Sequence, residues 1–240
     1  MVMLLYYEDE NVKISYKVKG FGYPLILLHG WQMHKETFDS LARDLSADFK
    51  VYQIDLPGFG LSVASEALSV EAYADVIHGF ISKYETLHPI ILGHSFGGRI
   101  AICYACKYPI KKLILVGVPG IRKPLNWYRR IKQFIHKKIR IVKGSSDYEK
   151  ANELLKKTLV LAVNYDLSEK LLSINCPTLL IWGKNDKEVK LKIACEMEKR
   201  ISGSELVVIP KCGHFPYLER YRYFLIVLRY FLLKDNLCLD

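Results

Sequence analysis

Short apolar runs alternate with longer amphipathic segments along most of the chain. Residues 12–18 (VKISYKV) alternate apolar and polar side chains, which predicts a half-exposed antiparallel strand. Later runs are continuously apolar, as in strands that helices cover on both faces. These buried strands are predicted at residues 24–28, 51–54, 90–92, 113–116 and 178–182. The N-terminus (MVMLLYYEDE) predicts a first strand, and residues 205–209 (ELVVI) predict a strand at the far edge of the sheet.

Helical patterns fill the intervals between these strands. They are predicted at residues 37–46, 70–84, 96–107, 187–201 and 217–233. Strands that alternate with helices in this way predict an α/β fold with a doubly wound, mostly parallel sheet and right-handed crossovers. Because ligands bind beyond the carboxyl ends of the strands in such sheets, the chemistry is expected in the loops at those ends.

The segment from about residue 120 to residue 175 interrupts this alternation. It contains helical patterns but no buried strand, and apolar side chains recur at three- and four-residue spacing over residues 127–142. Pro119-Gly120 and Cys176-Pro177 flank it. We therefore expect a single domain over residues 1–240 that carries a helical insertion at about 120–175.

Composition narrows the class of protein. Half of the 240 residues are hydrophobic and a quarter are charged, as in ordinary globular proteins. The six cysteines follow no disulfide spacing and no secretion signal is apparent, so we expect reduced thiols and a cytoplasmic protein. Cys103 and Cys106 form a C-x-x-C pattern, but no second pair completes a zinc site. Residues 221–233 are too short to cross a bilayer and contain two arginines, which predicts a buried last helix.

Net charge adds one unusual feature. The formal net charge is +10, and residues 121–146 contain nine basic side chains and no Asp or Glu. Subtracting nine from ten leaves a net charge of about +1 for the rest of the chain. The nine residues are Arg122, Lys123, Arg129, Arg130, Lys132, Lys137, Lys138, Arg140 and Lys143.

Ser95 lies in the most informative short motif. Residues 93–98 read Gly-His-Ser-Phe-Gly-Gly, a G-x-S-x-G pattern between a predicted strand and a predicted helix. The backbone of the nucleophile is strained in such a turn, so the residues two before and two after it must be small. The turn exposes the hydroxyl, and the helix N-terminus presents N–H groups to developing negative charge. We therefore predict that Ser95 is a nucleophile.

A serine nucleophile needs a base, and the base needs a carboxylate that orients it. His214 follows the last predicted strand, in KCGHF, and is the predicted base. Asp186 follows the strand at residues 178–182, in GKND, and is the predicted acid. The order Ser, Asp, His agrees with this type of nucleophile turn. Asp55 is the rival carboxylate, in a Pro- and Gly-rich turn where Asp commonly accepts local hydrogen bonds.

The other histidines receive different interpretations. His29 ends an early strand and is predicted to hold the loop that follows it, whereas His94 is predicted to point away from the nucleophile. Surface or packing positions are predicted for His34, His78, His88 and His136. The backbone N–H groups of Trp31, in the loop after that early strand, and of Phe96, after the nucleophile, are predicted to form the oxyanion hole.

Five motifs together resemble the α/β-hydrolase superfamily. They are LLHGW at 27–31, DLPGFGLS at 55–62, GHSFGG at 93–98, GKND at 183–186 and GHF at 213–215. The resemblance covers nearly the whole chain and implies a carboxylesterase-type serine hydrolase. HGW, DLPGFG and residues 155–158 are also similar to the pimeloyl-acyl-carrier-protein methyl ester esterases, in which we expect a tryptophan at the position of His94. Ser95 argues against the epoxide hydrolases and dehalogenases of the superfamily, which use an aspartate nucleophile.

The same resemblance implies that the insertion is a lid over an acyl pocket. Its apolar side chains Trp127, Ile131, Phe134 and Ile135 would roof the pocket, and the basic face would point outward. That basic segment, residues 121–146, is either a solvated surface or a docking site for an acidic carrier protein or an anionic membrane surface. No groove-reading motif is present, so nucleic acid is not an expected partner.

These observations predict the hydrolysis of a small-molecule carboxylic ester or thioester through an acyl-enzyme, with no cofactor and no metal. Two alternatives stay open. The same triad could transfer the acyl group to another acceptor or cleave an activated carbon–carbon bond. The pocket could instead belong to a ligand-sensing receptor in which turnover is incidental.

Overall fold

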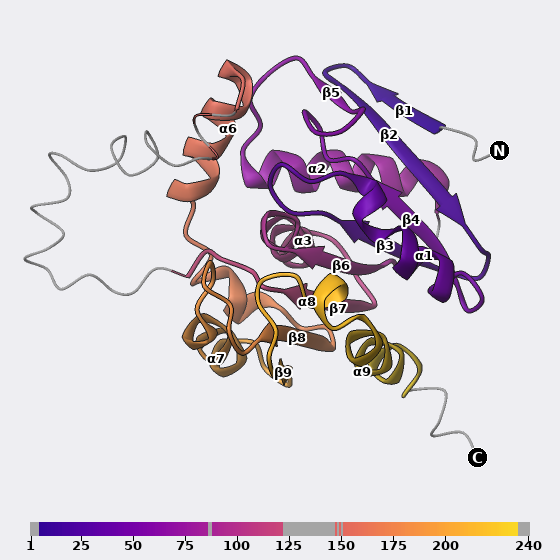
Figure 1. Cartoon of the computed structure of the whole chain (residues 1–240). Helices are drawn as coiled ribbons and strands as arrows, with labels where there is room; N and C mark the ends of the chain where they lie inside the picture. Colours follow the sequence, from indigo (N-terminus) through magenta and orange to yellow (C-terminus); the bar gives the residue numbers. More distant parts are fainter. Residues whose placement is uncertain (1–4, 86–87, 122–146, 148, 150, 235–240) are drawn as a thin grey trace, which may run out of the picture.

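The computed structural model describes residues 5–85, 88–121, 147, 149 and 151–234 (Figure 1). These residues form a nine-stranded sheet in the order β1-β2-β4-β3-β6-β7-β8-β9, with β5 paired to β2. The pairs that run from β4 to β9 in this order are parallel, and β2 pairs antiparallel with β1, β4 and β5. The strands are β1 (Leu5–Asp9), β2 (Val12–Lys19), β3 (Tyr23–Leu28), β4 (Phe49–Ile54), β5 (Val63–Ala64), β6 (Ile90–His94), β7 (Lys112–Val116), β8 (Thr178–Gly183) and β9 (Glu205–Ile209).

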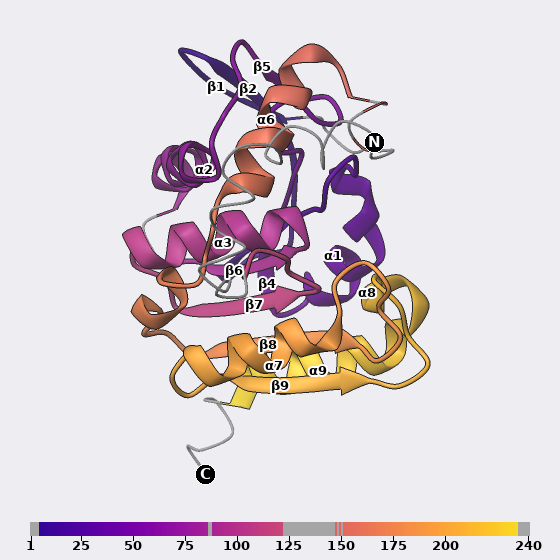
Figure 2. The same ribbon diagram turned by 90° about the vertical axis from the view of Figure 1, so that its left-hand side faces the viewer.

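Helices cover both faces of the sheet (Figure 2). Side chains of successive strand residues point to opposite faces. In β3, Ile26 and Leu28 therefore belong to the core cluster that also contains side chains of α2 (Val70–Tyr84), α3 (Phe96–Lys107) and α7 (Leu191–Arg200). Leu25 and Leu27 pack on the opposite face with α1 (Asp39–Leu45) and α9 (Tyr221–Leu233). The continuous apolar runs thus form strands that are buried on both faces, and the predicted fold class is confirmed.

Several helix boundaries differ from the prediction for local reasons. The predicted helix at 37–46 is a 3-10 turn, η1 (Lys35–Phe38), followed by α1. The helix predicted from residue 187 begins at Leu191, because the N–H groups of Glu188 and Val189 bind the Asp186 carboxylate instead of continuing a helical pattern. The last helix is split at Arg220, where φ is −135°, into α8 (Pro216–Glu219) and α9. By contrast, α2 and α3 have the predicted bounds.

Only part of the insertion lies within the described residues. It contains α6 (Glu153–Asn164) and a 3-10 turn, η2 (Lys170–Ser173). The Asn152 side chain caps α6 by accepting the N–H of Leu155 at 2.8 Å. The predicted amphipathic helix at 127–142 and the nine basic residues of 121–146 lie outside the described residues. The lid and the single domain over 1–240 therefore stay predictions.

The C-terminal helix packs against the sheet through one face. Phe224, Leu228 and Phe231 of α9 are buried, whereas Ile226 and Tyr230 are exposed. Across residues 5–85, 88–121 and 151–234, no helix has the length and apolar character needed to span a membrane.

Candidate active site

Ser95 occupies a strained turn between β6 and α3. Its backbone has φ 48° and ψ −110°, and a positive φ is uncommon for a residue other than glycine. The Ser95 N–H donates to the carbonyl of Val116 at 2.9 Å, which ties the turn to the end of β7. A Cβ on Gly97 would lie 2.3 Å from the carbonyl oxygen of Leu28, and one on Gly93 would lie 2.6 Å from that of Gly97. The two glycines are therefore required by close backbone contacts.

Asp186 and His214 form a buried pair at the ends of β8 and β9. The His214 Nδ1–H donates to Asp186 Oδ2 at 2.8 Å. The other carboxylate oxygen, Oδ1, accepts the backbone N–H groups of Glu188 at 2.9 Å and Val189 at 2.8 Å. Because a carboxylate can only accept hydrogen bonds, it places the proton on Nδ1 and leaves Nε2 as a basic nitrogen.

Two further glycines provide the space that this pair occupies. Gly117, directly after β7, has φ +57°, and a Cβ there would lie 3.1 Å from the His214 ring. A Cβ on Gly183, the last residue of β8, would lie 1.9 Å from the carbonyl oxygen of Gly213. The loops after β7, β8 and β9 can therefore pack closely enough to bring Asp186 and His214 together.

Ser95 lies on the wall of a cavity whose lining contains neither Asp186 nor His214. The cavity has a volume of about 400 Å³. Its lining includes Trp31, Ser95, Phe96, Arg99, Pro119, Gly120, Ile121, Asp147, Leu159, Ala162, Val163, Tyr165, Glu188 and Val189. Among the described residues, no hydrogen bond joins Ser95 Oγ to His214, and His214 Nε2 lies 3.6 Å from Glu188 Oε2. The Ser95–His214 contact therefore stays a prediction.

A larger hollow of about 710 Å³ lies elsewhere, between the end of β9 and the start of α9. It is lined by residues 209–211 and 218–223 and contains none of the predicted site residues. The smaller cavity is the better candidate because it contains Ser95, Trp31 and Phe96 together.

The His29 ring makes hydrogen bonds to the backbone of the loop that carries Trp31 and to that of Leu56. Its Nδ1–H donates to the carbonyl of Gly30 at 2.7 Å, and its Nε2 accepts the N–H of Leu56 at 3.0 Å. The Gly30 carbonyl and the Trp31 N–H belong to one trans peptide group, so they point in opposite directions. His29 therefore turns the Trp31 N–H away from itself. Burial lowers the pKa of His29 to about 4, which keeps the ring neutral at physiological pH.

The side chains of Trp31 and Phe96, whose backbone N–H groups are the predicted oxyanion donors, are in contact. Their rings contact edge to face with centroids 5.3 Å apart, and the Trp31 ring also contacts Phe59 at 5.0 Å. Phe96 is the first residue of α3, where helical N–H groups have no partner within the helix. Neither N–H has a hydrogen-bond partner among the residues that the structure describes. These two donors are the ones predicted, and their role in binding an oxyanion stays a prediction.

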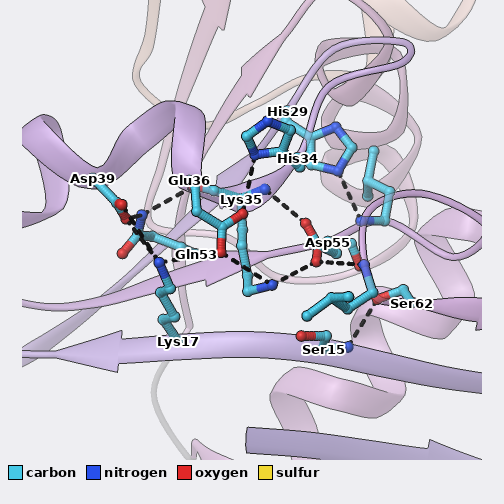
Figure 3. A network of polar contacts seen from close by, with 12 residues as sticks. Ser15, Lys17, His29, His34, Lys35, Glu36, Asp39, Gln53, Asp55 and Ser62 are labelled. Carbon is cyan, nitrogen blue, oxygen red and sulfur yellow. Dashed lines mark hydrogen bonds and ion pairs between the residues drawn. The ribbon is translucent and has the colours of Figure 1, made fainter. Parts of the chain in front are cut away.

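Asp55, the rival carboxylate, is engaged in a different network (Figure 3). Its Oδ2 binds Lys35 Nζ at 2.6 Å and the Leu61 N–H at 3.0 Å, and its Oδ1 accepts the Lys35 N–H at 2.7 Å. Both side chains of this ion pair are fully buried. A Cβ on Gly60 would lie within 2.4 Å of both carboxylate oxygens. Asp55 therefore joins the loops after β3 and β4, and the carboxylate that contacts His214 is Asp186.

His94 is the residue that sequence reasoning set aside. The structure places its ring 4.8 Å from the His214 ring, between centroids, with Nε2 3.0 Å from the His214 carbonyl oxygen. Its place next to Ser95 in the motif was the signal available in the sequence. Glu188 was also missed, because its distance from His214 depends on the turn that Asp186 initiates.

Metal chemistry has no candidate site in this part of the chain. Across the described residues, no group of three or more His, Cys, Asp or Glu side chains is arranged to hold an ion. Cys103, one half of the C-x-x-C pattern, is buried in α3, and Cys106 Sγ donates to the carbonyl of Lys170 at 3.1 Å.

Comparison with known proteins places the chain in a family. The alpha/beta hydrolase family matches residues 25–225. The chain belongs to this family. It is 29% identical to the pimeloyl-acyl-carrier-protein methyl ester esterase of Nitrosospira multiformis, over 87% of this chain and 94% of that protein. It is 28% identical to 2-hydroxy-6-oxononadienedioate/2-hydroxy-6-oxononatrienedioate hydrolase 1 of Pseudomonas putida, over 88% of each.

The solved structure of a thermophilic esterase from Thermogutta terrifontis has the same fold. The two structures superpose with a TM-score of 0.76 at 22% identity, over 97% of this chain and 98% of that chain. The α/β-hydrolase fold and the family that the five motifs indicate are thus confirmed.

The buried ion pair generates a prediction about stability. Asp55→Asn leaves the fully buried Lys35 ammonium with only the partly exposed Glu36 carboxylate, at 3.3 Å, as its counter-ion, so we expect the free energy of unfolding to fall by about 3 kcal/mol. Asp75→Asn is the matched control, because Asp75 pairs with Lys107 on the surface and its loss should cost at most about 1 kcal/mol. Urea denaturation of both variants measures the difference, and equal losses would contradict a structural role for the Lys35–Asp55 pair.

The two buried neutral histidines generate a prediction about pH. Burial lowers the pKa of His29 to about 4 and that of His94 to about 3, whereas both should titrate near 6.5 in the unfolded chain. The unfolded chain therefore binds more protons below pH 6.5, so stability is full above that pH and declines as pH falls toward 4. His29→Gln should make this decline less steep, whereas His88→Gln, at an exposed position with no side-chain ion pair among the described residues, should leave the slope unchanged. Urea midpoints measured from pH 7 to pH 4 test this, and identical slopes for parent and His29→Gln would refute it.

Proposed function

We propose that the chain is a serine hydrolase that cleaves carboxylic esters through an acyl-enzyme formed on Ser95. The observation that carries the proposal is the buried hydrogen bond of 2.8 Å between His214 Nδ1 and Asp186 Oδ2. That bond leaves Nε2 basic in a chain whose family membership and strained Ser95 turn independently favour nucleophilic catalysis.

Each step of the proposed reaction has an assigned group. Ser95 Oγ attacks the ester carbonyl carbon while its proton passes to His214 Nε2, and the Asp186 carboxylate stabilises the imidazolium that forms. The N–H groups of Trp31 and Phe96 donate to the carbonyl oxygen as it becomes negative. The imidazolium then protonates the leaving alcohol. Water attacks the acyl-enzyme with His214 again as base, which releases the acid and restores the Ser95 hydroxyl.

The lining of the cavity supports a neutral, largely apolar acyl group. Leu159, Val163 and Ile121 contribute apolar side chains, and Glu188 and Asp147 contribute carboxylates. Arg99 contributes one guanidinium, which donates to the carbonyls of Ala162 and Tyr165. These carboxylates should disfavour an acyl group that is itself anionic near the reacting carbon. The names of similar proteins support esters first and activated carbon–carbon bonds second. Rapid turnover of substrate would distinguish an ester hydrolase or a carbon–carbon bond hydrolase from a ligand-sensing receptor, in which turnover is incidental.

The basic segment supports a second, finer proposal about the partner. Residues 121–146 have nine positive charges and no acidic residue, and several similar proteins are esterases named for an acyl carrier protein. We propose that this segment docks an acidic carrier that presents the acyl ester. A lipid surface is the competing partner, and the experiment below separates the two.

The triad generates the first prediction of this proposal. Ser95→Ala should lower the turnover of p-nitrophenyl acyl esters by on the order of a million-fold. Asp186→Asn should lower it by roughly three to four orders of magnitude, because the imidazole loses the acceptor that fixes its tautomer. Stopped-flow and steady-state assays measure both, with melting temperatures as a check on folding.

Ser202→Ala is the matched control, since Ser202 is an exposed serine outside the cavity and its loss should leave turnover unchanged. Labelling with a fluorophosphonate should require Ser95 and be retained in the Ser202→Ala variant. Turnover of Ser95→Ala within tenfold of the parent would remove Ser95 from the mechanism.

The basic segment generates the second prediction. Replacing Arg129, Arg130, Lys137 and Lys138 with glutamine should leave hydrolysis of small soluble esters unchanged. Hydrolysis of an ester carried on acyl carrier protein should slow through its association rate. Added salt should slow the parent in the same way, because charges more than about 8–10 Å apart are screened at physiological ionic strength.

The comparison is made at low ionic strength with three substrates: a soluble ester, a carrier-bound ester, and an ester in anionic vesicles. A loss confined to vesicles would replace the carrier with a lipid surface. Equal rates of parent and variant on all three substrates would contradict docking and would leave residues 121–146 as a solvated surface.

A further inference from the structure

His94 has a hydrogen-bond donor directed at the backbone of the catalytic loop. It is the last residue of β6 and is 1% exposed. Its Nε2 lies 3.0 Å from the carbonyl oxygen of His214. Because a carbonyl oxygen can only accept, Nε2 carries the proton, and Nδ1 has a free lone pair that accepts the Tyr217 hydroxyl at 3.1 Å. These two bonds define one neutral tautomer of the ring.

The neutral state of His94 is compatible with the chemistry beside it. Burial, with a smaller contribution from the neighbouring His214, lowers the pKa of His94 to about 3. A permanently charged donor at this place would oppose the positive charge that His214 acquires during catalysis. The imidazole of His94 supplies a donor without that charge.

The ring of His94 also fills the space between two loops of the site. Its centroid lies 5.1 Å from each of the rings of Phe215 and Tyr217, which follow His214 in the sequence. On the other side, a Cβ on Gly30 would lie 2.8 Å from His94 Nδ1. His94 therefore contacts both the loop that carries the base and the loop that carries the predicted oxyanion donor Trp31.

Different side chains hold the backbone N–H groups and the carbonyl group of the loop at residues 213–215. Glu219 accepts the N–H of Gly213 at 2.6 Å and that of Phe215 at 3.0 Å, so the residues on either side of His214 are held through their N–H groups. The His214 carbonyl is held by His94, and no second donor to it is found in the described part of the chain. Within the described residues, the His214 ring makes one hydrogen bond, from Nδ1 to Asp186, and Glu188 Oε2 lies 3.6 Å from Nε2. The direction of the ring therefore also depends on how the backbone is held.

We propose that His94 is a positioning residue that fixes the backbone of His214 and thereby directs His214 Nε2 toward Ser95. This inference rests on the proposed function, since it assigns His94 a role in the same triad. It identifies the residue before the nucleophile as the link between the nucleophile turn and the base.

Two substitutions at His94 separate its hydrogen bond from its packing. His94→Phe keeps a planar ring but removes the donor, so kcat should fall on the order of 100-fold with KM within about twofold, because a small misplacement of a catalytic group has this effect. His94→Gln restores an N–H donor at a similar reach and should recover kcat to within about fivefold of the parent. Tyr217→Phe removes only the hydroxyl that orients His94 and should lower kcat roughly fivefold, as expected for one hydrogen bond.

The matched control is His78→Phe. His78 is a histidine of α2 that stacks on Tyr108 at 3.7 Å between centroids, outside the cavity, and its replacement should leave kcat unchanged. Recovery by glutamine supports the proposal, whereas a glutamine variant as slow as the phenylalanine variant would overturn it. A phenylalanine variant with kcat within twofold of the parent would also overturn it. If His94→Phe does not fold, His94→Gln and Tyr217→Phe decide the question by the same criteria.

A second measurement keeps this inference distinct from the proposed function. In the parent, the proton on His214 Nδ1 should give a far-downfield proton NMR signal that Asp186→Asn abolishes. His94→Phe, or Tyr217→Phe if the former does not fold, should shift or broaden this signal even if no ester is hydrolysed, and an unchanged signal would overturn the inference. Absence of turnover and of Ser95 labelling in the parent would instead remove the proposed function.

Discussion

The parallel arrangement of the central strands is the constraint on which the site depends. Five neighbouring strands, β3, β6, β7, β8 and β9, end at the same edge of the sheet, and each end carries one part of the site. Strand register fixes where these ends lie, and buried apolar side chains on both faces fix the register. The loops then approach so closely that Gly97 and Gly183 have no space for a Cβ, and a Cβ on Gly117 would lie 3.1 Å from the His214 ring. The contacts that fix the register of the strands therefore also fix the geometry of the candidate site.

Charge is distributed around the cavity in a way that suits a base. Two histidines next to the site, His29 and His94, are kept neutral by burial and act through hydrogen bonds to backbone groups. The buried Lys35–Asp55 pair is neutral as a unit and connects the loops after β3 and β4. In the proposed reaction, His214, with its hydrogen bond to the Asp186 carboxylate, is the group that acquires a proton.

Much of the fold and of the candidate site could be predicted from the sequence because the relevant signals are local. The apolar runs identify the buried strands, and the Gly-x-Ser-x-Gly spacing identifies Ser95 because the backbone contacts that require glycine lie within a few residues. The places of Asp186 and His214 after strands predict that they form a pair, and the structure joins them by a hydrogen bond, whereas their catalytic roles and that of Ser95 stay predictions. The start of α7 at Leu191 could not be predicted by periodicity, because the Asp186 side chain takes N–H groups that a helix would otherwise organise.

Long-range contacts account for what sequence reasoning missed. The partners of His94 are 120 and 123 residues away, and those of Asp55 include a lysine 20 residues earlier whose ammonium is fully buried. The place of His94 beside Ser95 marks it as near the site but does not identify these distant partners, and Asp55 follows a strand in a Pro- and Gly-rich turn that explains an Asp without one.

The most direct test of the account is a crystal structure of the protein inactivated by a fluorophosphonate, which mimics the tetrahedral intermediate. The account predicts a single adduct on Ser95 Oγ, with the phosphonyl oxygen within hydrogen-bond distance of the N–H groups of both Trp31 and Phe96. It also predicts that His214 Nε2 faces the adduct and that the bond from Nδ1 to Asp186 is retained. An adduct on another residue, or a phosphonyl oxygen that contacts neither N–H group, would contradict it.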